Sequence, residues 1–220
     1  MYTHTKEFLD SLTPYQAYEV LIDGNKRFVS NLKMNRNLLQ IMNETANGQH
    51  PFAVVLSCMD SRTSVELIFD QGLGDIFSIR IAGNVVNDDI IGSMEYACQV
   101  VGSKLIVVLG HTKCGAIKGA CEQVQMGHLT GLLEKIKPAI DKTGKKDCND
   151  PGFAEEVALS NVDHSIQEIL QRSEIINSLY QKGKIGIIGG VYSVETGTVD
   201  FTTELFKNKT SQHITQLETA

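Results

Sequence analysis

Apolar residues follow two patterns along the chain: short uninterrupted runs and longer segments with helical spacing. The runs are rich in Val, Ile and Leu, which is typical of strands buried on both faces of a sheet. They predict four strands, at residues 52–57, 75–83, 104–110 and 184–194. The sequence SVETGTVDF then predicts a turn into a last strand, antiparallel and at an edge of the sheet.

Between these runs, apolar residues recur at intervals of three or four, which predicts helices. The predicted helices span residues 15–32, 88–102 and 114–127, and residues 152–183 form one or two more. The chain has no internal repeat and no linker-like segment. We therefore predict a single domain over residues 1–220, with an N-terminal helical arm over about 1–48.

The alternation of strands and helices predicts an α/β fold: a mainly parallel central sheet of four strands plus an antiparallel edge strand, flanked by helices. In such sheets ligands bind beyond the carboxyl ends of the strands, where the strand order reverses. Two polar sequences occupy strand ends: SCMDSR at 57–62 and GHTKCG at 110–115. If the two strands are neighbours at the reversal point, these sequences meet in one crevice.

The two sequences concentrate five reactive side chains: Cys58, Asp60, Arg62, His111 and Cys114. Four interpretations are open. The residues could be unrelated core residues, a redox pair of thiols, a cysteine nucleophile with His111 as its base and Asp60 as its orienter, or a metal site. The other cysteines lack such surroundings, and we interpret them as structural: Cys98, Cys121 and Cys148.

A zinc site gives all five side chains a function. Zinc binds cysteine sulfur and histidine nitrogen, and three protein ligands leave one position open, as in catalytic sites. Cys58, His111 and Cys114 would be those ligands. Asp60 would fill the fourth position or hydrogen-bond whatever fills it. Arg62 would hold Asp60 through a two-pronged contact that keeps it ionised.

The composition limits which binding partners and which cellular compartment we expect for the protein. A 42% hydrophobic and 21% charged chain of 220 residues is ordinary for a soluble globular protein. Its net charge of −6 argues against nucleic acid or an anionic membrane as the main partner. The sequence shows no secretory signal and no apolar stretch of membrane-spanning length, which predicts a cytoplasmic protein. In that reducing compartment, five unevenly spaced cysteines indicate metal binding or catalysis more than disulfides.

Taken together, these residues resemble the β-class carbonic anhydrases. The family motifs are Cys-x-Asp-x-Arg followed by His-x-x-Cys-Gly, present here as CMDSR and HTKCG. Four further stretches are similar, so the resemblance covers roughly residues 15–202: GNKRF, GDIFSIRIAGN, SMEYA and GGVYSVETGTV. It implies zinc bound by Cys58, His111 and Cys114, with Asp60 and Arg62 as the catalytic dyad.

The resemblance also implies an activity, the reversible hydration of carbon dioxide to bicarbonate and a proton by zinc-bound hydroxide. It implies self-association as a dimer or a tetramer, and it places four residues around the substrate: Gln49, Phe77, Tyr96 and Gly115. The aromatic residues could come from two subunits. His50 is a candidate for the proton path. Two alternatives remain: a zinc hydrolase of the same fold acting on an analogue such as carbon disulfide, and a zinc-stabilised binding protein without catalysis.

Overall fold

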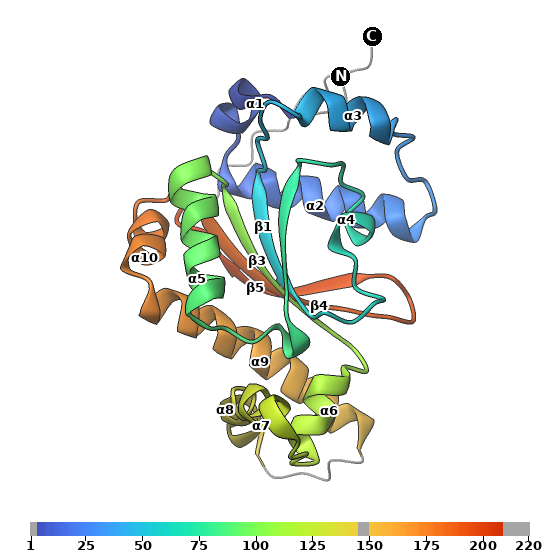
Figure 1. Ribbon diagram of the computed structural model, residues 1–220, viewed down its shortest axis with the longest axis vertical. Coiled ribbons are helices and arrows are strands. Elements are labelled where there is room, and N and C mark those ends of the chain that lie inside the picture. The colour runs from blue at the N-terminus through green and yellow to red at the C-terminus, as the bar shows by residue number, and fades with distance from the viewer. Residues whose placement is uncertain (1–3, 145–149, 209–220) are drawn as a thin grey trace.

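A five-stranded sheet forms the centre of the computed structural model, which describes residues 4–144 and 150–208 (Figure 1). The strand order is β2-β1-β3-β4-β5. Strands β1 to β4 are parallel, and β5 pairs antiparallel with β4 at one edge. The strands are β1 (Ala53–Ser57), β2 (Ile76–Arg80), β3 (Leu105–His111), β4 (Gly186–Tyr192) and β5 (Val199–Leu205). The predicted fold class is confirmed.

Strand β2 differs from its prediction in length and burial. It ends at Arg80, and the rest of the predicted run forms a short 3₁₀ turn, η1 (Ala82–Asn84). Buried and more exposed positions alternate along β2, whereas β1 and β3 are buried at every position. The difference arises because β2 is the edge strand next to β1 and is paired on one side only.

Three helices precede the sheet: α1 (Lys6–Ser11), α2 (Pro14–Val29) and α3 (Leu38–Thr45). α2 begins with a capping box between Thr13 and Gln16, which satisfies two backbone N–H groups at its start. It packs with α4 (Val65–Ile68) on one face of the sheet. Gly24 allows this packing, because a Cβ there would lie 1.8 Å from the carbonyl oxygen of Phe69.

The other face of the sheet is covered by α5 (Asp88–Glu95), α9 (Pro151–Arg172) and α10 (Glu174–Gln181) (Figure 1). α5 continues as a π-helix, η2 (Tyr96–Val101). The region 152–183 is thus two helices, divided at Ser173, whose side chain caps α10. Among the described residues, no helix is long and apolar enough to span a bilayer.

A small helical layer lies beyond the carboxyl ends of the parallel strands (Figure 1). It contains α6 (Gly115–Cys121), α7 (Gly127–Glu134) and α8 (Lys137–Thr143), packed against the start of α9. α6 ends earlier than predicted, and α7 and α8 were not predicted. Neither α7 nor α8 has a side-chain cap at its start, and the proline in the first turn of α8, Pro138, was not used in the prediction.

Replacing Asp70 with asparagine is expected to lower the free energy of unfolding by about 3 kcal/mol at pH 7. The Asp70 side chain is 2% exposed and accepts hydrogen bonds from Arg27 Nε and Arg36 Nη1, each at 2.5 Å. Burial raises the pKa of this carboxyl, but the two arginines outweigh burial and hold the pKa below its usual range. The variant keeps the shape of the side chain and removes the charge that both guanidinium groups face.

The pH dependence of the free energy of unfolding provides a second test of this prediction. A lowered folded-state pKa stabilises the protein above the unfolded value, about 3.9, and this stability is lost as the pH falls through the folded-state pKa. Urea unfolding should therefore show a wild-type advantage at pH 7 that shrinks in acid. Asp23→Asn is the control, since Asp23 pairs with Lys26 on the exposed surface of α2 and should contribute little. Equal unfolding midpoints for Asp70→Asn and Asp23→Asn would contradict the prediction.

Candidate metal centre and its surroundings

The two motifs meet at the reversal point of strand order, as predicted. β1 is followed along the chain by β2 on one side, and β3 pairs with β1 on the other. Cys58 directly follows β1, His111 is the last residue of β3, and Cys114 precedes the first residue of α6. All three side chains are buried. The parallel register of β1 and β3 therefore brings residues 56 positions apart into one site.

The three side chains have the geometry of a metal site. One ligand atom from each of Cys58, His111 and Cys114 lies within 4.8 Å of the other two. The two sulfurs are 3.9 Å apart. That is far longer than a disulfide bond, and it matches the separation of about 3.8 Å for two sulfurs at about 2.3 Å from zinc in a tetrahedral shell. The donor set and its spacing fit zinc.

The His111 ring is oriented so that one nitrogen is free to bind a metal. Its Nδ1 lies 2.9 Å from the carbonyl oxygen of Thr112. A carbonyl only accepts, so Nδ1 donates its hydrogen and the lone pair lies on Nε2. Nε2 is buried and has no hydrogen-bond partner among the described residues. An unpartnered buried nitrogen is costly unless something binds it, and a metal ion satisfies it.

The pKa values of the two thiols are shifted in opposite directions. Hydrogen bonds from the Cys114 thiol and from the Gly83 N–H lower the pKa of Cys58, to about 4, although burial opposes this shift. The pKa of Cys114 is raised, because its thiol donates to Cys58, is buried and lies beside a negative charge. These opposite shifts favour a thiolate at Cys58 over one at Cys114. The site therefore holds a thiolate readily, which is the form that binds zinc.

The η1 turn supports Cys58 from behind. The Gly83 N–H lies 3.4 Å from the Cys58 sulfur. Gly83 has φ +66°, a conformation that favours glycine. A Cβ at this position would also lie 2.9 Å from the Ile136 side chain, so there is no space for a larger residue. Asn161 and Ser165 of α9 donate hydrogen bonds to the carbonyl oxygens of Gly83 and Asn84. The sequence prediction did not single out this turn, although it quoted IRIAGN within a family-like stretch.

Asp60 and Arg62 form a two-pronged pair on the loop that follows Cys58. Arg62 Nε and Nη2 lie 2.9 and 2.8 Å from the two carboxylate oxygens of Asp60, and the Arg62 backbone N–H also donates to Asp60. This pairing holds the pKa of the Asp60 carboxyl well below its usual range. Asp60 is not a member of the group of converging ligand atoms. In this structure its carboxylate is engaged by Arg62, with 20% of the side chain exposed.

The expected substrate residues lie in three different places. Gly115 directly follows Cys114, and a Cβ there would meet no atom within 4 Å. Phe77 and Tyr96 face each other with ring centroids 6.3 Å apart, in a cavity of about 620 Å³ that none of the three metal ligands lines. Gln49 and His50 precede β1, near α3, at the end of the sheet opposite α6 (Figure 1). Of these expected substrate residues, only Gly115 lies next to one of the three candidate ligands within one chain.

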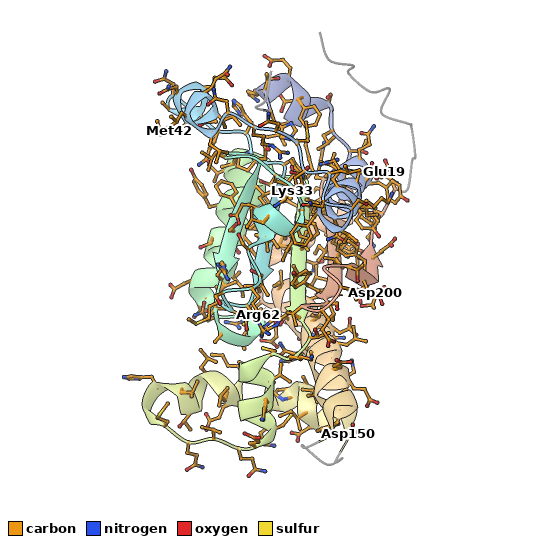
Figure 2. The ribbon with its side chains drawn as sticks, turned by 90° about the vertical axis from the view of Figure 1, so that its right-hand side faces the viewer. Glu19, Lys33, Met42, Arg62, Asp150 and Asp200 are labelled. Carbon is orange, nitrogen blue, oxygen red and sulfur yellow. The ribbon has the colours of Figure 1, made fainter. Side chains whose placement is uncertain are left out.

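Figure 2 shows from the side that the loop carrying Arg62 and the helix α3 lie far apart in the molecule. Arg62 lies near the small helical layer, and Met42 of α3 lies at the far end of the molecule.

The remaining cysteines agree with a structural interpretation. Cys98 and Cys121 are buried, and burial raises the pKa of Cys98 to about 12. Cys148 lies outside the described residues.

The protein is thus an α/β protein with a parallel sheet and, at the reversal point of that sheet, two thiols and an imidazole that could hold a metal ion. The comparisons identify the family. The family model "Carbonic anhydrase" matches residues 53–199. The chain is 34% identical over 199 residues to Carbonic anhydrase 2 of Mycobacterium tuberculosis, with 86% of this chain and 93% of that protein covered.

Two solved structures share the fold. The β-carbonic anhydrase CcaA superposes with a TM-score of 0.66 at 27% identity, over 84% of this chain and 94% of that chain. One of two tetrameric β-carbonic anhydrases of Sordaria macrospora superposes with a TM-score of 0.66 at 24% identity, over 74% and 86%. The chain belongs to the carbonic anhydrase family and is an enzyme of its β class.

Proposed function

We propose that the protein catalyses the reversible hydration of carbon dioxide to bicarbonate and a proton, with zinc held by Cys58, His111 and Cys114. The observation that carries the proposal is the buried, unpartnered Nε2 of His111, which converges with the two sulfurs. Bound zinc would lower the pKa of a water molecule and so supply a hydroxide nucleophile near neutral pH. Three protein ligands leave a position for that water.

Asp60 would orient the nucleophile. Asp60 Oδ1 receives two N–H groups from Arg62, whereas Oδ2 receives only one, so Oδ2 keeps a lone pair that can accept a second hydrogen bond. Accepting the O–H of the nucleophile would point its remaining lone pair at the substrate carbon. Arg62 would keep Asp60 ionised and away from the metal. The pairing geometry and the lowered pKa of Asp60 support both roles.

A second copy of the chain would complete the substrate pocket. Phe77, Tyr96 and Gln49 are separated from the metal ligands within one chain, so they can act on substrate only in a partner's site. Large exposed apolar side chains on α3, in the segment before it and on η2 support such a contact, with exposed fractions between 50% and 71%: Leu32, Met34, Leu38, Leu39, Met42, Tyr96 and Val100. The Sordaria macrospora relative is described as tetrameric. Gly115 would line the same pocket beside Cys114.

The test is stopped-flow hydration of carbon dioxide together with metal analysis of the purified protein. We expect about one zinc ion per chain and hydration that a chelator removes and added zinc restores. A parallel assay with carbon disulfide separates the proposed reaction from its main alternative. Zinc-loaded protein that does not hydrate carbon dioxide would refute the proposal, and turnover of carbon disulfide alone would establish the alternative.

A further inference from the structure

The loop that carries Asp60 and Arg62 depends on contacts with other parts of the protein for its position. Residues 58–64 run from the end of β1 to the start of α4, and Asp60, Arg62 and Thr63 lie on this loop. Asp60 and Arg62 bind each other across two positions, so their pairing is local to the loop. Outside this loop, Arg62 Nη2 reaches the carbonyl oxygen of Lys113 at 3.4 Å, a long contact that does not fix the pair by itself. Its position must be fixed by contacts from outside the pair.

Arg80 supplies those contacts from the neighbouring strand. It is the last residue of β2 and is paired with Ser57 in the parallel register, so its backbone is fixed by the sheet. Its Nε lies 3.3 Å from the carbonyl oxygen of Cys58, and its Nη2 lies 2.5 Å from the carbonyl oxygen of Asp60. One guanidinium group therefore binds the backbone of a metal ligand and the backbone of the dyad acid.

The Thr63 hydroxyl lies against the same two carbonyl oxygens from inside the protein and can donate its one hydrogen to either of them. Its hydroxyl lies 2.9 Å from the carbonyl oxygens of both Cys58 and Asp60, and the residue is 1% exposed. Arg80 Nη2 also lies 3.4 Å from this hydroxyl, in position to donate to it. The two side chains thus form one network around the loop backbone.

From these contacts we propose that Arg80 is a positioning residue of the dyad, with Thr63 as its buried partner. The planar guanidinium group holds two acceptors at a fixed separation, so it fixes the distance between the Cys58 and Asp60 carbonyl groups. Asp60 is thereby held at a set position relative to the metal ligand. A lysine has one point charge on a flexible stem and cannot hold both carbonyls in this way. This proposal rests on the proposed function and adds the contacts that hold Asp60 in position.

The test replaces Arg80 with glutamine and compares it with Arg172→Gln. Arg172 also makes charge-assisted hydrogen bonds, to Asp88 and Glu168, at a surface away from the loop. We expect kcat/KM for carbon dioxide to fall about 10- to 100-fold in Arg80→Gln, the usual effect of losing a contact behind a metal site. Zinc content should stay at the wild-type level, and Arg80→Lys should recover little. Arg172→Gln should keep wild-type kcat/KM.

Two further readouts separate positioning from general damage. Thr63→Val should lower kcat/KM in the same direction, and its effect should not add to that of Arg80→Gln, because both act on the same carbonyl groups. Cobalt(II)-substituted protein gives a readout without turnover, since its visible absorption depends on the ligands and geometry around the metal. We expect a changed spectrum in Arg80→Gln and an unchanged one in Arg172→Gln.

Several outcomes would overturn the proposal: wild-type kcat/KM and an unchanged cobalt spectrum in Arg80→Gln, loss of zinc in that variant, or an equal fall in Arg172→Gln. Failure of the proposed function is a separate result. It would appear as zinc-loaded wild-type protein without hydration activity, and the cobalt spectra would then still decide whether Arg80 positions the loop.

Discussion

Replacing Cys58 with serine is expected to abolish both zinc retention and the hydration of carbon dioxide. A serine hydroxyl stays protonated at neutral pH and is a poor zinc ligand, so Cys114 and His111 would be left as two ligands. Losing a direct ligand should lower metal affinity by more than the roughly 10- to 100-fold that changes behind a metal site cost. Metal analysis after dialysis and stopped-flow hydration measure the two effects.

Cys98→Ser is the matched control for this variant. Cys98 is as buried as Cys58, at 5% and 4% exposure, but it lies in the core between the sheet and α5 and is not among the converging ligand atoms. Cys98→Ser should keep zinc and activity, with at most a small loss of stability from the buried hydroxyl. Stoichiometric zinc in Cys58→Ser would contradict the ligand assignment. Equal zinc loss in both variants would show that damage to the core, and not ligand loss, is responsible.

The sequence was sufficient to predict the parallel sheet, and it predicted the meeting of the two motifs on one condition. Strands buried on both faces must be apolar throughout, so β1 and β3 are visible as uninterrupted runs. The polar residues that directly follow such runs lie at the carboxyl edge of the sheet. The prediction that Cys58 and Cys114 meet needed one further condition, that β1 and β3 are neighbours. The structure supplies it.

Other features depend on contacts that no local pattern contains. Arg80 was quoted within a family-like stretch, but its hydrogen bonds to the β1 loop follow from the pairing of β1 with β2. Gly83 likewise reaches Cys58 only because η1 folds back behind β1. Gln49 is nine positions from Cys58 in sequence, yet β1 lies between them and carries them to opposite ends of the sheet. Closeness in sequence therefore did not give closeness in space.

Replacing Asp60 with asparagine is expected to remove most of the turnover and to leave zinc in place. Asparagine has nearly the same shape, and its carbonyl oxygen can still accept from Arg62. Its amide nitrogen is a donor and would stand where the carboxylate offers an acceptor. The nucleophile would lose the hydrogen bond that aims it, and a misaligned reacting group costs about 100-fold or more in rate. Stopped-flow kcat/KM and zinc content, measured on the same preparation, report the two quantities separately.

Asp141→Asn is the control, because Asp141 forms an exposed pair with Lys137 on α8 and has no contact with the metal ligands among the described residues. Its turnover should equal that of the wild type. If Asp60→Asn keeps full turnover, Asp60 does not direct the nucleophile and the Asp60–Arg62 pair is a surface ion pair. If it loses zinc together with turnover, Asp60 contributes to metal binding. Only loss of turnover with zinc retained fits an acid that acts on the nucleophile, because the three ligand atoms converge without Asp60.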